Sequence, residues 1–364
     1  MTANNKKILF VIPYLHLGGA ETQFRNLING LAQDDQFKID VFVLSRISIE
    51  NKTKLHDCIN LKSIGLNFNK SYSNRYIRNF WYIINYLWVP IYLICNFFKV
   101  KRYDTIISYR LLMTPFIPVF KICSKKVIFS ERTASQEILN KKWMAFLFNY
   151  SNYITCNSLV TKDYLELIGV RNVKVIFNGI NYKKILPVKN NIVFKRAAVI
   201  ARIHPLKNQL IVLKALKKIE GIIISFVGEI TDKQYMTTLE QYIKFNNLSH
   251  KVEFINFTDD ILEHYLKADF VILPSLEEGM SNVILESLLH HRFIISSNIP
   301  ANKIINKNRG GVFEVLDENS LIFEINKLKK INKSYYIKLL EQNSIFIKNQ
   351  FSLDAMVNNY KKLL

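Results

Sequence analysis

Cysteine is scarce in this sequence, and the few cysteines form no recognisable site. None of the four belongs to a Cys-x-x-Cys pair or has histidine partners at the spacing of metal ligands; they are Cys58, Cys95, Cys123 and Cys156. This argues against a zinc site or a disulfide framework. We expect buried free thiols in a reducing compartment.

Long apolar runs are also missing. The first run, Ile8 to Ile12, has the length of a strand and is shorter than the apolar core of a signal peptide, so we expect a cytoplasmic protein. The segment from Phe80 to Phe98 comes close to a membrane-spanning length, but Asn85, Pro90 and Asn96 interrupt it. A transmembrane span is therefore disfavoured.

Acidic residues are scarce in one region. The chain has a formal net charge of +21, and residues 51–150 hold 16 basic and only 4 acidic residues. A basic excess is often only a solvated face, but one of this size favours an anionic partner, either nucleic acid or an anionic membrane. Residues 76–102 mix Tyr, Trp and Phe with Ile and Leu between basic ends, as in a helix at a membrane interface. An ordinary buried helix is the alternative. Nucleic-acid binding would need aromatic residues interleaved with basic ones on strands, and none are seen.

The chain alternates between strand-like and helix-like segments twice over. Expected strands are 7–12, 38–44, 103–108, 126–130, 153–157 and 173–177, then 192–200, 222–227, 251–255, 269–273 and 293–296. Expected helices are 20–33, 76–100, 141–150 and 161–168, then 207–219, 232–246 and 282–290. This predicts an α/β protein with two doubly wound parallel sheets, each binding ligands at the carboxyl ends of its strands. A polar, basic linker at 181–191 separates them.

Residues 274–287 are the most informative stretch for function. An apolar strand enters a glycine-containing loop, and the loop opens a helix. Unpaired N–H groups and the positive end of the dipole make such a helix start an anion site. Glu278 stands before it and Glu286 lies two turns into the helix, where the carboxylates can accept from sugar and ribose hydroxyls. The alternative is a surface helix with two solvated glutamates.

The string from Glu278 to Glu286 resembles the glutamate-x7-glutamate motif of retaining glycosyltransferases of family four, which have the GT-B fold of two Rossmann-like domains facing a cleft. Three more segments match this family: Gly18-Gly19-Ala20-Glu21, Ser130-Glu131-Arg132, and Ala201-Arg202 with Lys207. The resemblance implies an N-terminal acceptor-binding domain (1–185), a C-terminal nucleotide-sugar domain (186–350) and a last helix (351–364) that packs back on the N-terminal domain.

The resemblance also implies roles for individual residues. The catalytic set is Glu278, Arg202 and Lys207, with both cations holding the donor diphosphate as the sugar bond breaks. Further donor contacts come from Gly18, Gly19, Gly279, Met280, Ser281, Asn282 and Glu286. Arg132 and Glu131 are candidate acceptor contacts, with a structural Arg–Glu pair as the alternative.

Two departures from the family pattern and one absence accompany this resemblance. There is no histidine at the strand end Ser108-Tyr109-Arg110, and only one glycine at Val227-Gly228-Glu229. There is no Asp-x-Asp motif, and Asp259-Asp260 lies in a predicted polar loop, so we expect neither a metal nor a cofactor.

The sequence thus predicts a retaining, metal-independent glycosyltransferase. We expect it to move a hexose or N-acetylhexosamine from a nucleoside-diphosphate sugar, UDP-linked, to a lipid-linked saccharide in bacterial surface-polysaccharide synthesis. It would work peripherally on the inner face of the cell membrane and would not bind nucleic acid. The alternatives are a soluble acceptor, or a basic membrane- or nucleic-acid-binding protein without chemistry, which would have no need of Arg202, Lys207 and the two glutamates.

Overall fold

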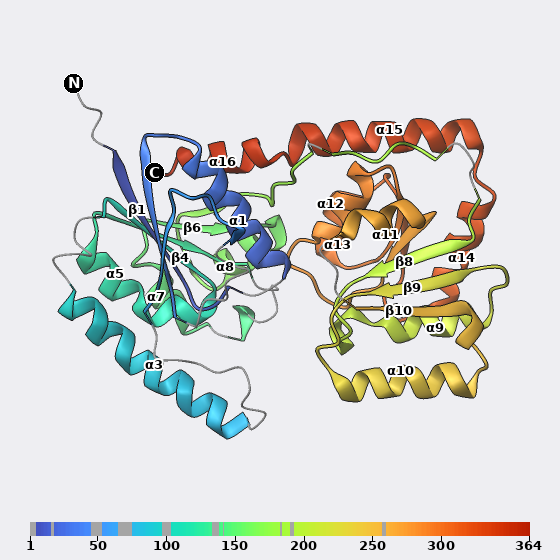
Figure 1. The fold of residues 1–364 in the computed structure, drawn as a ribbon, viewed down its shortest axis with the longest axis horizontal. Coiled ribbons are helices and arrows are strands. Elements are labelled where there is room, and N and C mark those ends of the chain that lie inside the picture. The colour runs from blue at the N-terminus through green and yellow to red at the C-terminus, as the bar shows by residue number, and fades with distance from the viewer. Residues whose placement is uncertain are drawn as a thin grey trace. The chain divides into compact units, whose positions relative to one another are not determined.

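The protein is described from a computed structural model (Figure 1). The residues it describes are 5–15, 18–44, 53–64, 75–96, 103–132, 138–140, 142–182, 184–189, 193–256 and 260–364. The chain forms two compact units: unit 1 is Met1–Gly179 with Leu353–Leu364, and unit 2 is Ile180–Ser352. The sequence-based boundaries were 185/186 and 350/351.

Unit 1 contains a seven-stranded parallel sheet in the order β3-β2-β1-β4-β5-β6-β7. Its strands are β1 (Lys6–Ile12), β2 (Phe37–Val43), β3 (Asn60–Ser63), β4 (Thr105–Tyr109), β5 (Lys126–Ser130), β6 (Tyr153–Cys156) and β7 (Val173–Val175). The central strands are apolar on both faces because helices cover both sides. The short edge strand β3 was not predicted, since only one of its four residues is apolar.

Two helical layers cover this sheet (Figure 1). On one face, α1 (Gly19–Ala32) packs with α16 (Leu353–Lys361). The other face packs against α3 (Arg75–Cys95), η1 (Leu111–Phe116), α5 (Ile117–Cys123), α7 (Met144–Phe148) and α8 (Leu159–Leu167). Cys123 and Cys156 are buried in the core between the sheet and this second layer, but Cys58 and Cys95 are exposed, so the expectation of four buried thiols was wrong for two of them.

Helix α3 presents two different faces. Val89 and Leu93 are buried, and the indole N–H of Trp88 donates to the carbonyl of Ile64 at 2.9 Å. A stripe of exposed apolar side chains faces away from the core: Ile83, Leu87, Ile91 and Ile94. In the part of the chain that the structure describes, no helix is long and apolar enough to cross a bilayer. The side chain of Trp81 lies outside the described residues.

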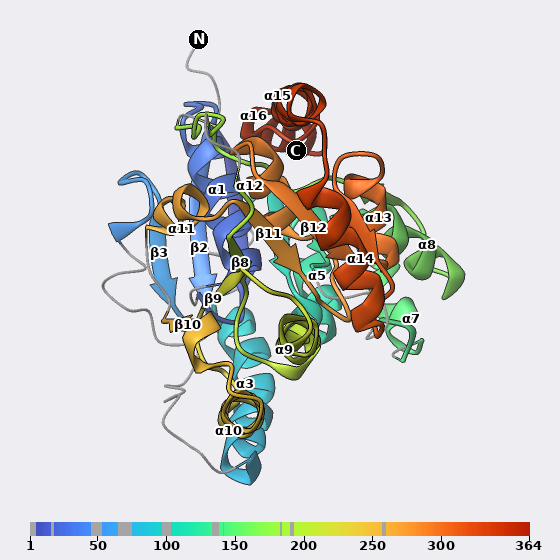
Figure 2. The same ribbon diagram turned by 90° about the vertical axis from the view of Figure 1, so that its right-hand side faces the viewer.

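Unit 2 contains a six-stranded parallel sheet in the order β10-β9-β8-β11-β12-β13 (Figure 2). Its strands are β8 (Arg196–Ile200), β9 (Ile223–Val227), β10 (Val252–Ile255), β11 (Phe270–Leu273), β12 (Phe293–Ser297) and β13 (Gly311–Phe313). Its helices are η2 (Pro205–Lys207), α9 (Gln209–Lys217), α10 (Lys233–Phe245), η3 (Ser249–Lys251), α11 (Ile261–Lys267), α12 (Asn282–Leu289), α13 (Pro300–Asn306), α14 (Glu318–Lys329) and α15 (Lys333–Gln350). The prediction of two doubly wound parallel sheets is confirmed.

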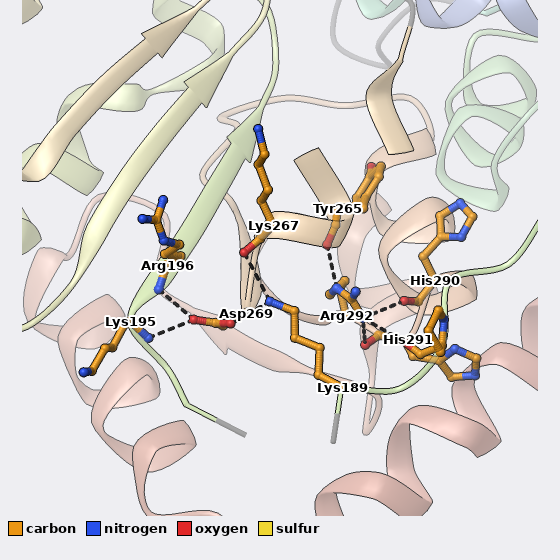
Figure 3. Close-up of polar contacts among 10 residues, drawn as sticks. Lys189, Lys195, Arg196, Tyr265, Lys267, Asp269, His290, His291 and Arg292 are labelled. Atoms are coloured by element: carbon orange, nitrogen blue, oxygen red, sulfur yellow. Dashed lines mark hydrogen bonds and ion pairs between the residues drawn. The ribbon is translucent and has the colours of Figure 1, made fainter. Parts of the chain in front are cut away.

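A buried arginine holds the linker, the first part of unit 2, against the rest of that unit (Figure 3). Arg292 stands directly before β12 and is 1% exposed. Its Nε donates to the carbonyl of Tyr265 at 2.6 Å, and its Nη1 donates to those of His290, His291 and Pro187 at 3.1, 3.0 and 3.3 Å. The carbonyl of Tyr265 lies at the carboxyl end of α11, and those of His290 and His291 lie at the carboxyl end of α12. At such an end the last carbonyls have no partner within the helix, and a positive charge is favoured.

Asp269, directly before β11, completes this edge of the sheet (Figure 3). It accepts from the ammonium of Lys189 at 2.7 Å and from the backbone N–H groups of Lys195 and Arg196 at 3.0 and 2.8 Å. The part of the linker that the structure describes is therefore held on unit 2 by charged groups at the amino ends of its strands.

Candidate functional site

The stretch singled out in the sequence lies at the carboxyl edge of the unit 2 sheet. β11 ends at Leu273, residues 274–281 form the loop, and α12 begins at Asn282. Ser281 is the N-cap of α12, and its hydroxyl makes no capping bond. The geometry is thus the predicted strand, loop and helix start, where an open α/β sheet binds its ligands.

Glu278 is held in this loop by two donors. The ammonium of Lys207 lies 2.6 Å from its Oε1, and the hydroxyl of Ser275 donates to the same oxygen at 2.7 Å. Lys207 ends η2, the turn that leads from β8 into α9, and the N–H of Leu276 donates to the carbonyl of Leu206 at 2.9 Å. Two loops that are far apart in the sequence are therefore joined, with one cation and one carboxylate at the junction.

Arg202 follows β8, and its side chain is exposed. Its backbone is fixed, because the carbonyl accepts from the amide of Gln209 at 2.8 Å. Gly228 follows β9 with φ +155°, and a Cβ there would lie 2.2 Å from the carbonyl oxygen of Ala201. The single glycine of Val227-Gly228-Glu229 is thus required by the close approach of two strand ends.

Glu286 lies on α12 and contacts α11. Its carboxylate accepts from the hydroxyl of Tyr265 at 2.8 Å. Burial raises the pKa of Glu286 to about 7, although the hydrogen bond from Tyr265 acts in the opposite direction. This carboxyl therefore changes charge near neutral pH, unlike an exposed glutamate.

The residues that hold the loop of Glu278 in place through buried hydrogen bonds were not predicted from the sequence. The hydroxyl of Ser297, at the end of β12, donates to the carbonyl of Ser275 at 2.6 Å. The amide of Asn302, on α13, donates to the Ser297 hydroxyl at 3.1 Å. All three are buried. The only sequence signal was two serines at the end of an otherwise apolar strand.

In unit 1, Gly18 and Gly19 open α1 as expected, and Gly18 is its N-cap. A Cβ on Gly18 would lie 2.7 Å from a carboxylate oxygen of Glu21. Glu21 is buried and forms an ion pair with Arg110, which also donates to the hydroxyl of Tyr14 at 2.9 Å. Arg110 has φ 73°, a region that favours glycine, and it follows β4, where the family histidine is absent.

Arg132 is bound within unit 1. Its guanidinium donates to the hydroxyl of Tyr360 on α16 at 2.5 Å, to Asn178 Oδ1 at 3.0 Å and to Ser130 Oγ at 3.1 Å. Glu131 is buried and accepts from the backbone N–H of Arg132 at 2.8 Å. The guanidinium also donates to the backbone carbonyl of Ile176 at 3.4 Å, so its position is fixed by three side chains and one carbonyl.

Asp260 is the N-cap of α11, where its carboxylate accepts from the N–H of Glu263, and Asp259 lies outside the described residues. Among the residues that the structure describes, no group of three or more His, Cys, Asp or Glu side chains could hold a metal ion. Metal independence stays a prediction.

Comparisons with known proteins agree with this geometry. Residues 195–330 match the family described as Glycosyl transferases group 1. One relative, a UDP-Gal:alpha-D-GlcNAc-diphosphoundecaprenol alpha-1,3-galactosyltransferase of Escherichia coli, is 28% identical over 52% of this chain and 53% of its own. Another, the GalNAc-alpha-(1->4)-GalNAc-alpha-(1->3)-diNAcBac-PP-undecaprenol alpha-1,4-N-acetyl-D-galactosaminyltransferase of Campylobacter jejuni, is 24% identical over 98% of both chains. The chain spans only 53% to 62% of the length of two of its relatives.

Solved structures match over the whole chain. Anabaena Alr3699/HepE, crystallised in complex with UDP and glucose, has a TM-score of 0.79 and 18% identity, with 99% of each chain covered. At this identity the match shows the fold. The chain therefore has the GT-B fold of glycosyltransferases, and its residues 195–330 belong to the group 1 glycosyl transferases.

Proposed function

We propose that this protein transfers a hexose or N-acetylhexosamine from a UDP-sugar to a lipid-linked saccharide, with retention of the anomeric configuration. The observation that carries the proposal is the junction of Lys207 with Glu278 at the carboxyl edge of the group 1 domain. It combines a cation for a diphosphate leaving group with a carboxylate for sugar hydroxyls, and Arg202 supplies a second cation nearby in sequence.

Each residue of the site has a distinct task in this proposal. Lys207 and Arg202 neutralise the charge that develops on the departing nucleoside diphosphate. Glu278 accepts from donor sugar hydroxyls and orients the anomeric carbon. Backbone N–H groups of residues 279–282 bind phosphate oxygens at the start of α12. Gly18 and Gly19 allow a close approach to the donor from unit 1, and Glu286 accepts from the ribose.

The names of the relatives support this class of acceptor. The Escherichia coli and Campylobacter jejuni enzymes are named for acceptors linked to undecaprenol through a diphosphate. We therefore infer an acceptor of this class, held by unit 1 with contacts from Arg132 and Glu131, and a reaction at the cytoplasmic surface of the membrane. The exposed apolar stripe of α3 would face that surface.

A donor screen tests the proposal. Radiolabelled nucleotide sugars are incubated with the protein, with and without a prenyl-diphosphate-linked saccharide, and the released nucleoside diphosphate and labelled lipid are measured. Labelled lipid supports the proposal. Transfer only to soluble sugars would mean that the acceptor is not lipid-linked. If no donor releases its nucleoside diphosphate, the protein is a binding protein and not a transferase.

Retention is expected to be visible in the product. NMR coupling constants at the new anomeric centre should show the configuration of the donor sugar. An inverted linkage would contradict the roles given to Glu278 and Lys207, because inversion requires a base that activates the acceptor on the opposite face of the sugar.

Transfer should continue in a chelator. Because Arg202 and Lys207 supply the positive charge, EDTA is expected to leave the initial rate within about twofold of its untreated value. Activity that EDTA abolishes, and that only Mn²⁺ or Mg²⁺ restores, would mean that a metal carries the diphosphate.

Donor binding should depend on pH through Glu286. Its pKa of about 7 means that the carboxyl is mostly neutral at pH 6 and mostly ionised at pH 8. Ribose hydroxyls bind the ionised form better, so affinity for the UDP-sugar should rise with pH, by about tenfold between pH 6 and 8 if only that form accepts. Calorimetric titrations of wild type and Glu286→Gln measure this. The variant should show a flat profile, and an equal slope in both proteins would assign the titration to another group.

A further inference from the structure

The two helical layers of unit 1 differ in what they expose. Every large apolar side chain that is exposed in the described part of unit 1 lies on the layer of α3, α5, α7 and α8 or in its adjoining turns: Ile83, Leu87, Ile91, Ile94, Ile122, Trp143, Phe146, Tyr150, Leu159 and Leu167. The opposite layer, α1 with α16, exposes no such side chain in the described residues. Scattered exposed apolar residues are normal, but a one-sided set marks an interaction surface.

Aromatic residues gather at one part of this layer, around α7. Trp143 is 67% exposed and Phe146 is 68% exposed, and the Phe146 ring contacts Tyr150 edge-on at 5.2 Å between centroids. Helix α5, which exposes Ile122, packs beside α7. We call Ile122, Trp143, Phe146 and Tyr150 the aromatic patch. Tryptophan and tyrosine are the residues that favour the boundary between lipid and water.

The charges around the aromatic patch fit an anionic surface. Lys121, Lys125 and Lys142 are exposed on or beside α5 and α7, and Lys125 forms an exposed ion pair with Asp104 at 3.4 Å. The sequence has no Asp or Glu in 105–130 or in 138–162. A second copy of the chain is a poor occupant, because a two-fold contact would place these lysines against the same lysines of the partner. An anionic bilayer can take up the apolar rings and can attract the positive charge of the lysines.

The contacts of α5 and α7 place the aromatic patch along one face of the unit 1 sheet. α7 packs against η1, and η1 begins directly after Arg110, at the carboxyl end of β4. The patch extends from there toward the amino edge of the sheet, because Tyr150 lies shortly before β6 and Lys121 donates to Asn152 Oδ1 at 2.8 Å, an oxygen that also accepts from the N–H of Val127 at the start of β5. A bilayer that contacts the patch would therefore lie along this helical layer of unit 1.

We propose that the aromatic patch is a membrane anchor, separate from α3, which inserts into an anionic lipid surface and holds unit 1 at the surface where lipid-linked acceptors lie. The use of the anchor rests on the proposed function, but the contact with lipid can be measured without it.

Vesicle flotation tests the anchor. Wild-type protein is floated with neutral phosphatidylcholine vesicles and with vesicles containing about one third phosphatidylglycerol, at about 0.1 M and about 0.5 M NaCl. The test variant is Trp143→Ser with Phe146→Ser. The matched control is Phe245→Ser with Phe323→Ser, which removes two exposed aromatic rings from unit 2. Because all four side chains are exposed, both variants should have the melting temperature of the wild type.

Wild type and control are expected to bind the anionic vesicles, and the test variant should bind at least about tenfold more weakly in high salt, where only apolar insertion remains. Wild-type-like flotation of the test variant would overturn the anchor, and so would a wild type that does not bind vesicles. A wild-type dimer in light scattering that the test variant abolishes would assign the patch to a second copy instead.

Transfer to a short-chain, water-soluble prenyl-diphosphate saccharide separates this inference from the proposed function. The test variant should match wild type in that assay and lose activity only with acceptor in vesicles. If wild type transfers no sugar in either assay yet still needs Trp143 and Phe146 for flotation, the proposed function fails and the anchor stands.

Discussion

Replacing Lys207 by alanine is expected to lower kcat for sugar transfer by about 10²–10³-fold, equivalent to about 2.7–4 kcal/mol of transition-state stabilisation. The ammonium lies 2.6 Å from Glu278 and only 19% of its side chain is exposed, so it acts where water screens little. Because the leaving diphosphate carries more negative charge in the transition state than in the bound donor, kcat and kcat/KM should fall together. Steady-state kinetics measure both.

The loss must be separated from damage to the loop. Lys218, at the end of α9, also forms an ion pair with a glutamate but is exposed, so Lys218→Ala is the matched control and should have wild-type kinetics. Lys207→Ala should also be made in a Glu278→Gln background. A further large loss there shows that Lys207 contacts the donor directly, whereas no further loss shows that it acts only by holding Glu278.

Arg202→Ala is the companion variant. Its guanidinium is exposed, so stability should change by less than about 0.5 kcal/mol while turnover falls strongly. Near-wild-type turnover in both Arg202→Ala and Lys207→Ala would remove these residues from the active site.

The second large effect concerns stability. Arg292→Met is expected to reduce the free energy of unfolding of unit 2 by about 3–5 kcal/mol, because it removes the guanidinium that donates to four backbone carbonyls. For a unit of this size, the melting temperature should fall by about 6–20 °C. Differential scanning calorimetry measures the shift.

The control is the same substitution at a nearby arginine. Arg196 is also drawn in Figure 3, but its side chain is exposed and only its backbone takes part in the network: its N–H donates to the Asp269 carboxylate at 2.8 Å, and its carbonyl accepts from the N–H of Asp269 at 2.8 Å. Arg196→Met should therefore melt within about 2 °C of wild type. Arg292→Lys should be intermediate, because an ammonium cannot reproduce the planar geometry that reaches several carbonyls. If Arg292→Met and wild type have the same melting temperature, water must hydrogen-bond to these carbonyls as favourably as the guanidinium does.

The sequence by itself determined the fold class and the core of the candidate site. Strands such as β1 and β11 are short apolar runs bounded by turns, and long helices such as α10 show a clear apolar face, so local pattern is enough to find them. The donor loop is also local. The segment from Leu273 to Glu286 contains the strand end, the glycine and the helix start close together in the sequence, and the structure forms it as expected.

Short or weakly patterned elements could not be predicted in the same way. Helices α11 and α13 have only seven residues each, too few for a periodicity to appear, and β13 has three. Helix α15 is long, but its buried positions include Asn343 and Ser344, so burial does not follow apolarity there. In these elements, tertiary packing decides the structure.

Only the tertiary structure decided how side chains far apart in the sequence are paired. Arg132, whose contact with an acceptor stays a prediction, donates to Tyr360, a residue 228 positions away. Lys207 contacts Glu278 across 71 positions, and Arg292 bonds to the carbonyl of Pro187 across 105. The sequence shows which groups carry charge. The crossovers of a parallel sheet determine which strand ends become neighbours, and therefore which of those charges meet.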